Sequence, residues 1–343
     1  MHFTDLGNGK TWAIVLAAGD GTRLRALTAN RDGVAVPKQY CSLRAGPSLL
    51  REALRRAFRL VPRARTCAVV AAQHSRWWNG RELAASHFVV QPENRGTANG
   101  ILLALVRILA RDPEARVVVL PADHHVADER VLAQSMSSAV AALVDERADI
   151  VMLGMTPERV DPGLGYIEPD GLMKQQLVRI GGFVEKPTRV HATKLIEAGA
   201  LWNTFIVAAN GRKLLEVLRA REPSVVSDMQ RCAADVRAVA PSAALRELYR
   251  ELPVVDFSRD VAQENPTAFH ALRVPACGWS DLGTVDRVRE ALQRGGRSAS
   301  APDAVVDTVS LARALWSERL PAHAVCDLTD ELGVRTVEVV PAR

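Results

Sequence analysis

The stretch that most constrains the fold lies at residues 12–27 and reads WAIVLAAGDGTRLRAL. Its first five residues form an apolar run of strand length, which is typical of a buried strand in a parallel sheet. Two alanines follow, and then Gly19 and Gly21 allow a sharp backbone turn in which several N–H groups can point into one concavity. Such a turn can bind phosphate oxygens, although ordinary strand-to-helix turns also use glycine.

The glycine spacing excludes two common nucleotide-binding motifs. A P-loop needs GxxxxGK followed by Ser or Thr, and the dinucleotide fingerprint needs GxGxxG; neither is present. Arg23 and Lys38 add positive charge close to the glycines. The residues therefore predict a phosphate-binding turn of another type, with a purely structural turn as the alternative.

The rest of the chain alternates short apolar strands with amphipathic helices, which predicts an α/β fold with helices on both faces of a sheet. Glycine-punctuated strands from Gly163 onward indicate a mixed or antiparallel extension, so we expect a Rossmann-like, mixed but mostly parallel sheet. We expect one domain over residues 1–294, followed by a linker and a small C-terminal extension over residues 295–343. Strands are expected at residues 66–73, 87–92, 116–125, 149–155 and 201–209. Helices are expected at residues 49–61, 76–85, 101–111, 131–144, 213–219, 242–252 and 285–292.

Several finer expectations follow from the helix patterns. Ser48 and Thr97 stand where helix N-caps are expected. The helices over 213–219 and 242–252 are expected to form a lid or second lobe. Four arginines of the helix over 49–61 fall mostly opposite its apolar positions, so we expect them to face solvent rather than nucleic acid; they are Arg51, Arg55, Arg56 and Arg59.

Composition and charge exclude several classes of protein. The 343 residues are 48% hydrophobic and 24% charged, as in ordinary globular proteins. The net charge of +5 is too small and dispersed for a nucleic-acid binder, but it suits a pocket for an anionic metabolite. We expect no membrane association and a cytoplasmic location, because no signal peptide or apolar run of about 18 residues is seen. The five cysteines form no CxxC pair and are expected to be free thiols.

Two aspartates follow apolar strands and lie in turns rich in small residues. These are Asp123 and Asp281, and Mg²⁺ prefers such anionic oxygens, with water and substrate phosphates as further ligands. Each could instead be a helix cap or turn residue. His124 and His125 are adjacent, so a regular strand cannot direct both at one ligand, and no zinc-like spacing accompanies them.

Polar residues at other strand ends suggest sugar and phosphate contacts. Lys186 ends a strand just before Pro187 and could hold a phosphate or remain solvated. Gly165, Glu168 and Asn203 supply a close-approach glycine, an acceptor and a mixed donor and acceptor, which suit sugar hydroxyls. Each of the three also has an ordinary role in turns or strand ends.

Taken in order, these motifs resemble one family, the sugar-phosphate nucleotidyltransferases, and within it the mannose-1-phosphate guanylyltransferases. The motifs span residues 12–284 and are LAAGDGTRL with PKQ, ENRGTA, PADH, GYIE, FVEKP, LWNTF and GWSDLG. PADH and GWSDLG favour the guanylyl-type branch over relatives that act with UTP or dTTP.

The resemblance implies transfer of a nucleotidyl group from GTP to a hexose 1-phosphate, such as mannose 1-phosphate, with Mg²⁺ as cofactor. GDP-sugar and pyrophosphate would form by metal-assisted in-line displacement, without a general base or covalent intermediate. A homodimer is reasonable for the family, and a single activity is expected because the chain ends before the isomerase domain of longer relatives. The residues that the resemblance implies for nucleotide binding are Ala17, Ala18, Gly19, Gly21, Thr22, Gly96 and Thr97. Those it implies for catalysis are Arg23, Lys38, Asp123, Lys186 and Asp281, of which Asp123 and Asp281 would bind the metal. Those it implies for binding the sugar phosphate are Gly165, Glu168, Glu185, Lys186 and Asn203.

The chain also departs from the family pattern. Arg25 and Ala26 stand where a Trp-Pro pair is usual, and residues 255–263 only loosely resemble a segment that normally carries another lysine. Two alternatives follow. One keeps the fold but uses another NTP and sugar 1-phosphate, such as glucose 1-phosphate, and the other is a non-catalytic regulatory paralogue that binds nucleotide sugars.

Overall fold

The computed structural model describes residues 9–29, 34–43, 46–78, 87–171, 176–233 and 240–294. All helices and strands reported below lie within these ranges. The extension predicted over residues 295–343, and most of the helix predicted over 76–85, lie outside the described residues.

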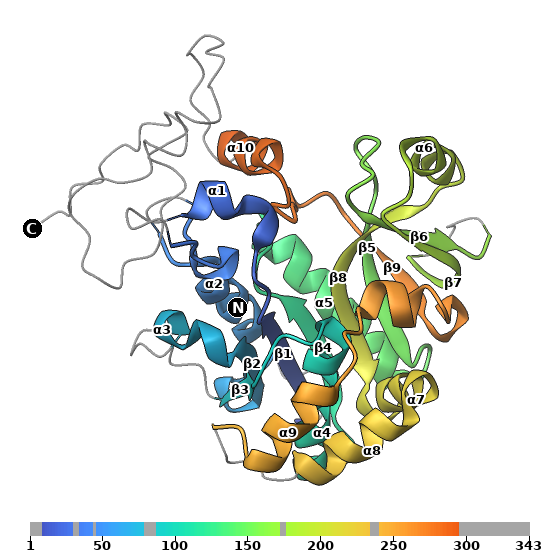
Figure 1. The fold of residues 1–343 in the computed structure, drawn as a ribbon. Coiled ribbons are helices and arrows are strands. Elements are labelled where there is room, and N and C mark those ends of the chain that lie inside the picture. The colour runs from blue at the N-terminus through green and yellow to red at the C-terminus, as the bar shows by residue number, and fades with distance from the viewer. Residues whose placement is uncertain are drawn as a thin grey trace, which may run out of the picture.

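One mixed sheet organises the described residues, as the sequence predicts (Figure 1). The sheet order is β3-β2-β1-β4-β8-β5-β9-β7-β6, with a further pairing between β8 and β6. The strands β3, β2, β1 and β4 are mutually parallel, so their carboxyl ends lie along one edge. The strand bounds are β1 Thr11–Ala17, β2 Thr66–Ala71, β3 His87–Gln91, β4 Arg116–Pro121, β5 Ile150–Met155, β6 Gly165–Pro169, β7 Leu177–Glu185, β8 Leu201–Asn210 and β9 His270–Val274.

The strand β8 lies in the middle of the sheet and runs antiparallel to both of its neighbours, β4 and β5. Its register against β5 shifts between Met152 and Gly154. A Cβ atom at Gly154 would lie 2.7 Å from the Leu201 side chain, so glycine allows β8 to approach closely at the shift. The start of β8 thereby also pairs with β6.

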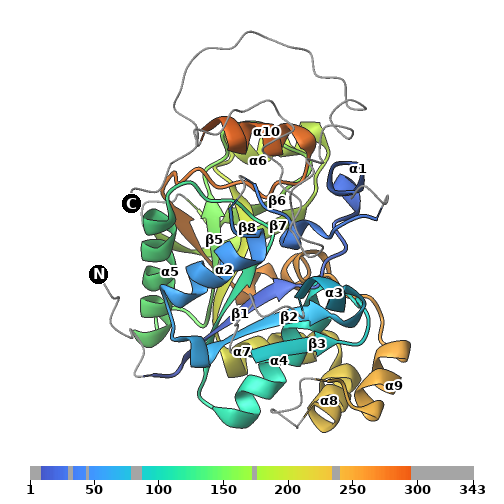
Figure 2. The same cartoon turned by 90° about the vertical axis from the view of Figure 1, so that its left-hand side faces the viewer.

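Two apolar layers fill the space between the sheet and its helices. One contains buried side chains from α2, α5, α6 and α10, and the other from α4, α7, α8 and α9. Figures 1 and 2 show α4, α8 and α9 gathered on one side of the molecule. The helix bounds are α1 Arg25–Thr28, α2 Leu49–Phe58, α3 Ser75–Trp78, α4 Thr97–Arg111, α5 Glu129–Val144, α6 Arg189–Glu197, α7 Gly211–Arg221, α8 Pro223–Cys232, α9 Ala243–Glu251 and α10 Val285–Arg294.

Helix placement corrects the expectation of a lid. The helix predicted over 213–219 is α7, which packs against α4 and α8, and α9 packs against α8. The sequence pattern shows that these helices are amphipathic, but not which apolar surface they cover. Across the described ranges, every helix is too short or too polar to cross a membrane.

The predicted helix cap at Ser48 is confirmed, whereas Thr97 and Arg56 differ from their predicted roles. Ser48 caps α2 and accepts a hydrogen bond from the Arg51 N–H at 3.3 Å. Thr97 instead begins α4 after Gly96 and forms no cap. Arg56 is 1% exposed rather than solvated, because its guanidinium donates to both carboxylate oxygens of Glu129, at 2.7 and 3.0 Å.

Candidate active site

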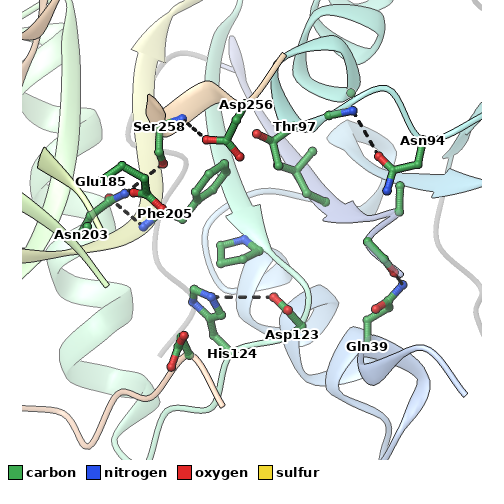
Figure 3. Close-up of a pocket in the computed structure, with 18 of the residues that line it drawn as sticks. Gln39, Asn94, Thr97, Asp123, His124, Glu185, Asn203, Phe205, Asp256 and Ser258 are labelled. Atoms are coloured by element: carbon green, nitrogen blue, oxygen red, sulfur yellow. Dashed lines mark hydrogen bonds and ion pairs between the residues drawn. The ribbon is translucent and has the colours of Figure 1, made fainter. Parts of the chain in front are cut away.

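The carboxyl ends of β1, β3 and β4 open into a cavity of about 480 Å³. Open α/β sheets bind their ligands at this edge. Figure 3 shows Asn94 and Gln39 on one side of the cavity, Asn203 and Glu185 on the opposite side, and Asp123 between them. The predicted site residues that line it are Ala18, Gly19, Arg23, Gly96, Thr97, Asp123, Gly165, Glu185, Lys186, Asn203 and Asp281. The others, Ala17, Gly21, Thr22, Lys38 and Glu168, are not part of the lining.

The glycine turn after β1 is stabilised by hydrogen bonds from the Gln39 side chain. The Gln39 Nε2 group donates to the carbonyls of Ala17 and Gly19, at 3.0 and 2.8 Å. Gly21 has φ of 60°, and a Cβ atom there would lie 3.0 Å from the backbone nitrogen of Lys38. The turn therefore needs glycine both for its left-handed backbone and for its close approach to the segment that carries Lys38.

Arg23 presents a cation to the cavity just after this turn. Its side chain is exposed and lines the cavity. Among the described residues it makes no ion pair or hydrogen bond. An arginine in this position is available for a ligand phosphate. Thr22, which precedes it, is also exposed but does not line the cavity.

Lys38 occupies a buried position behind the cavity wall, which differs from the predicted direct contact with nucleotide phosphates. It is 5% exposed, and its Nζ lies 2.9 Å from Asp123 Oδ2 and 2.6 Å from the carbonyl oxygen of Asp281. Lys38 thus links the glycine-turn segment to both carboxylate-bearing loops. Its burial follows from its position in the 3-10 helix Lys38–Tyr40, a feature that the PKQ motif alone does not reveal.

The loops that carry Asp123 and Asp281 are tied together by backbone hydrogen bonds. His125 and Ser280 exchange two such bonds, at 2.8 and 2.9 Å. Between these residues and the cavity, the indole nitrogen of Trp279 donates to His124 Nδ1 at 3.3 Å. Burial lowers the pKa of His124 to about 4, so the ring is neutral near pH 7 and carries its proton on Nε2.

The two aspartates are ionised, and both line the cavity. Burial alone would raise the pKa of Asp123, but the charge and hydrogen bond of Lys38 hold it below the ordinary value. Burial opposes ionisation of Asp281 in the same way, and the charge of Arg287 outweighs it, which keeps the pKa of Asp281 low. Asp281 Oδ1 accepts from the Gly283 N–H and from Arg287, at 3.1 and 2.5 Å, while Oδ2 has no hydrogen-bond donor among the described residues.

The donor set fits a hard divalent cation that takes its remaining ligands from a bound anion or water. Four carboxylates of the described residues line the cavity, against two cationic side chains, Arg23 and Lys186; the carboxylates are those of Asp123, Glu185, Asp256 and Asp281. A polyanionic ligand would therefore need additional positive charge to enter. No cluster of three or more acidic, His or Cys side chains suited to a metal occurs in the described part of the chain, so a Mg²⁺ ion would use at most Asp123 and Asp281 and take its other ligands from phosphates and water.

The opposite end of the cavity is built from β6, β7 and β8. A Cβ atom at Gly165 would lie 2.5 Å from Glu185 Oε2, so glycine leaves space for that carboxylate. Asn203 donates to Ser258 Oγ at 3.3 Å, and Lys186 pairs with Glu185 Oε1 at 2.8 Å. Glu168 lies three residues after Gly165 on β6, so the two residues face opposite sides of the sheet. The Glu168 side chain packs against Gly182 of the neighbouring strand β7 instead.

Backbone strain is concentrated around this cavity. Lys186 and Phe205 line it with φ of 50° and 60°, and Leu282, next to Asp281, has φ of 49°. Among described residues only one other non-glycine residue, Glu146, has positive φ. Such left-handed residues cost about 1–3 kcal/mol each and are typically retained at functional sites.

The helical segment after Asp256 was not expected from the sequence. Residues Phe257–Ala262 form a π-helix whose N-terminus is capped by Asp256, through the Ser258 and Arg259 N–H groups. Thr97 Oγ1 accepts from the Phe257 N–H at 2.8 Å, which anchors this segment to the start of α4. π-helical turns are often found at functional sites, and the departure of residues 255–263 from the family pattern was the signal in the sequence.

The sequence interpretation also missed a buried amide at the end of β3. Gln91 is 2% exposed and lines the cavity. The hydroxyl of the buried Tyr249 donates to Gln91 Oε1 at 3.3 Å. This bond leaves the Gln91 NH₂ group as the donor that a ligand can meet. Further lining residues that were not predicted include Asn94, His124, Phe205, Val254, Asp256 and Ser258.

Comparison with known protein families agrees with this geometry. The family model described as nucleotidyl transferase matches residues 12–295. The chain belongs to the nucleotidyl transferase family. The match includes the whole sheet apart from the first residue of β1, and every residue that lines the cavity.

Curated relatives of this nucleotidyl transferase are similar over most of the chain. The alginate biosynthesis protein AlgA of Pseudomonas aeruginosa is 26% identical over 285 residues, covering 79% of this chain and 56% of the relative. Mannose-1-phosphate guanylyltransferase 2 of Escherichia coli O157:H7 is 27% identical over 291 residues, covering 79% of this chain and 58% of the relative. The chain thus spans little more than half the length of these relatives.

Solved structures show the same fold. A structure described as mannose-1-phosphate geranyltransferase from Thermus thermophilus has 30% identity and a TM-score of 0.66, covering 80% of this chain and 76% of that one. A UDP-glucose pyrophosphorylase complexed with UDP-glucose has 16% identity and a TM-score of 0.53, covering 83% and 97%, and supports the fold alone.

Proposed function

We propose that this nucleotidyl transferase converts GTP and a hexose 1-phosphate, mannose 1-phosphate in the first instance, to GDP-hexose and pyrophosphate. The observation that carries the proposal is the arrangement of one cavity with two different ends. A glycine turn with the exposed Arg23 forms one end, and Asn203, Glu185 and Lys186 form the other. Asp123 lies between Gln39 and Asn203 (Figure 3), and Asp281 also lines the cavity.

The phosphate end suits a nucleoside triphosphate. Arg23 would bind phosphate oxygens, and bound Mg²⁺, held by Asp123 and Asp281, would neutralise charge on the phosphates during transfer. Lys38 acts from behind: it keeps the Asp123 carboxylate ionised and fixes it relative to the Asp281 loop. The acceptor phosphate of the sugar is already ionised near neutral pH, so the chain needs to align the two substrates rather than remove a proton.

Between these ends, the cavity wall around Gln91 and Thr97 is where we place the nucleotide base, and this wall favours a carbonyl over an amino group. The Gln91 amide offers its NH₂ group because Tyr249 holds its oxygen. Guanine presents a carbonyl oxygen at position 6, whereas adenine presents an amino group there, so GTP is favoured over ATP. Uracil and thymine also present a carbonyl, and for this reason the test must include their triphosphates.

The sugar end suits a phosphorylated hexose. Glu185 and Asn203 can accept or donate hydrogen bonds to hydroxyl groups, and the exposed Lys186 can turn from Glu185 towards the sugar phosphate. The strained backbone of Lys186 directs this side chain from the end of β7 into the cavity wall.

A pyrophosphate-release screen tests the proposal. The purified protein would be assayed with Mg²⁺ over a matrix of GTP, ATP, UTP and dTTP against mannose 1-phosphate and glucose 1-phosphate. We expect the highest kcat/KM with GTP and mannose 1-phosphate. Higher activity with another pair would overturn the substrate assignment, and no pyrophosphate release with any pair would overturn the activity itself.

A further inference from the structure

Arg287 lies buried between two carboxylates that come from distant parts of the chain. Its side chain is 6% exposed, and those of Asp161 and Asp281 are 12% and 11% exposed. The Nε and Nη2 groups donate to Asp161 at 3.0 and 2.5 Å, while Nη1 donates to Asp281 Oδ1 at 2.5 Å. One guanidinium therefore joins two segments that are distant in sequence, since Arg287 and Asp161 are 126 residues apart.

On one side, Asp161 shapes the turn that leads into the sugar end of the cavity. Its Oδ1 accepts from the Gly163 N–H at 3.0 Å, and its backbone N–H and C=O both bond the buried hydroxyl of Tyr166, each at 3.1 Å. The Leu164 carbonyl in this turn accepts from the Lys186 N–H at 3.2 Å. Gly163, Leu164 and Lys186 all line the cavity, so the position of Asp161 sets the position of that wall.

On the other side, Asp281 belongs to the phosphate side of the cavity. Its backbone carbonyl accepts from Lys38 Nζ at 2.6 Å, and Lys38 in turn holds Asp123. A continuous series of ion pairs and hydrogen bonds thus runs from Asp123 through Lys38, the Asp281 backbone carbonyl, the Asp281 carboxylate and Arg287 to Asp161. Apart from the outer residue Arg159, whose Nε lies 3.8 Å from Asp161, no other charged side chain in the described residues pairs with these two aspartates.

The geometry requires arginine rather than any cation. A guanidinium presents a planar fork that can bond one carboxylate through two nitrogens and a second carboxylate through the third. A lysine ammonium at the same position would be a single point charge and could not keep both carboxylates in register. The fit is tight, because a Cβ atom at Gly163 would lie only 2.9 Å from Arg287 Nη2.

We propose that Arg287 is a positioning residue that fixes the distance between the sugar-phosphate wall of the cavity and the Asp281 side that holds the nucleotide phosphates. This inference rests on the proposed transferase activity, in which the sugar phosphate must meet the α-phosphate of the nucleotide in line. Arg287 itself does not line the cavity, so it acts through Asp161 and Asp281.

The test compares Arg287→Lys and Asp161→Asn with the wild-type protein. We expect both variants to fold and to bind GTP, measured by calorimetry without sugar, within about threefold of wild type. Because a displacement of about 1 Å can cost a hundredfold in rate, we expect kcat/KM for mannose 1-phosphate to fall about 10- to 100-fold in Arg287→Lys. The double variant should lose little more than Arg287→Lys alone, since both changes break one connection.

Arg289→Lys is the matched control, because Arg289 lies on the same helix and pairs with Asp286 at the surface. It should keep wild-type kinetics. Equal losses of GTP affinity and sugar-phosphate kinetics, in proportion to a lowered Tm, would show a purely structural role and overturn the inference, as would unchanged kinetics in Arg287→Lys. Absence of turnover in the wild-type protein would instead overturn the proposed function, on which this inference depends.

Discussion

Gly96 offers a sharp test of how the cavity is built near the start of α4. It precedes α4 with φ of 86° and ψ of 168°, a backbone conformation that almost only glycine adopts. A Cβ atom at this position would collide with the backbone carbonyl of Val255. We therefore expect Gly96→Ala to destabilise the protein for two separate reasons, the backbone conformation and the contact with the segment around Val255.

The magnitude follows from the contacts that would be lost. An alanine in this conformation costs about 1–2 kcal/mol. Moving Val255 away would break two backbone hydrogen bonds, Ala98 N–H to the Val255 carbonyl at 3.1 Å and Val255 N–H to the Arg95 carbonyl at 3.2 Å. Each is worth about 1 kcal/mol, so the free energy of unfolding should fall by about 3–4 kcal/mol in total.

Gly199→Ala provides a matched control. Gly199 has φ of 85°, but a Cβ atom there would meet nothing within 4 Å, so only the conformational cost of about 1–2 kcal/mol applies. At about 2 °C for each kcal/mol, differential scanning calorimetry should show Tm lowered by about 6–8 °C in Gly96→Ala and about 2–4 °C in Gly199→Ala. Equal losses in the two variants would refute the contact with Val255 as the reason for glycine. GTP affinity should fall in Gly96→Ala alone, because Thr97 and Asp256 lie next to this contact.

Three further changes test separate parts of the structure. Asp123→Asn should lower the rate of pyrophosphate release by about 100-fold or more, by analogy with the loss of other transition-state contacts. Its unfolding transition should remain cooperative, and normal turnover would exclude Asp123 from the site. Glu129→Gln leaves the buried Arg56 without a charged partner and should lower the free energy of unfolding in urea by about 3 kcal/mol; a loss below about 1 kcal/mol would mean that the pair is solvated. Tyr249→Phe removes the hydroxyl that orients Gln91 and should reduce the ratio of kcat/KM for GTP over ATP by about fivefold, and an unchanged ratio would argue against this orientation.

The sequence predicts the sheet and the position of the cavity well, for a physical reason. Apolar runs followed by small or acidic residues mark the ends of parallel strands, and those ends share one edge. Gly19, after β1, and Asp123, after β4, accordingly line one cavity, although they are distant in the chain. Local patterns were sufficient here because the sequence of a strand shows by itself where that strand ends.

The sequence did not predict features that depend on a distant partner. Arg56 stands opposite the apolar positions of α2, and only the presence of Glu129, 73 residues away, explains its burial. Lys38 follows a motif suggestive of phosphate binding, yet Asp123 and the Asp281 carbonyl hold it behind the wall. Periodicity reports which face of an element is polar, but not which charged group will be found there.

The central place of β8 limits how the molecule can deform. Because β8 pairs with β4 on one side and with β5 and β6 on the other, the strands that support the two ends of the cavity belong to one hydrogen-bonded plate. Separating the two halves of this sheet at β8 would break the backbone hydrogen bonds that join β8 to β4 and β5, so opening the cavity along this line is costly. An opening that admits the proposed substrates would therefore involve the rim: the turn around Arg23, and the segment around Val254, which is 68% exposed.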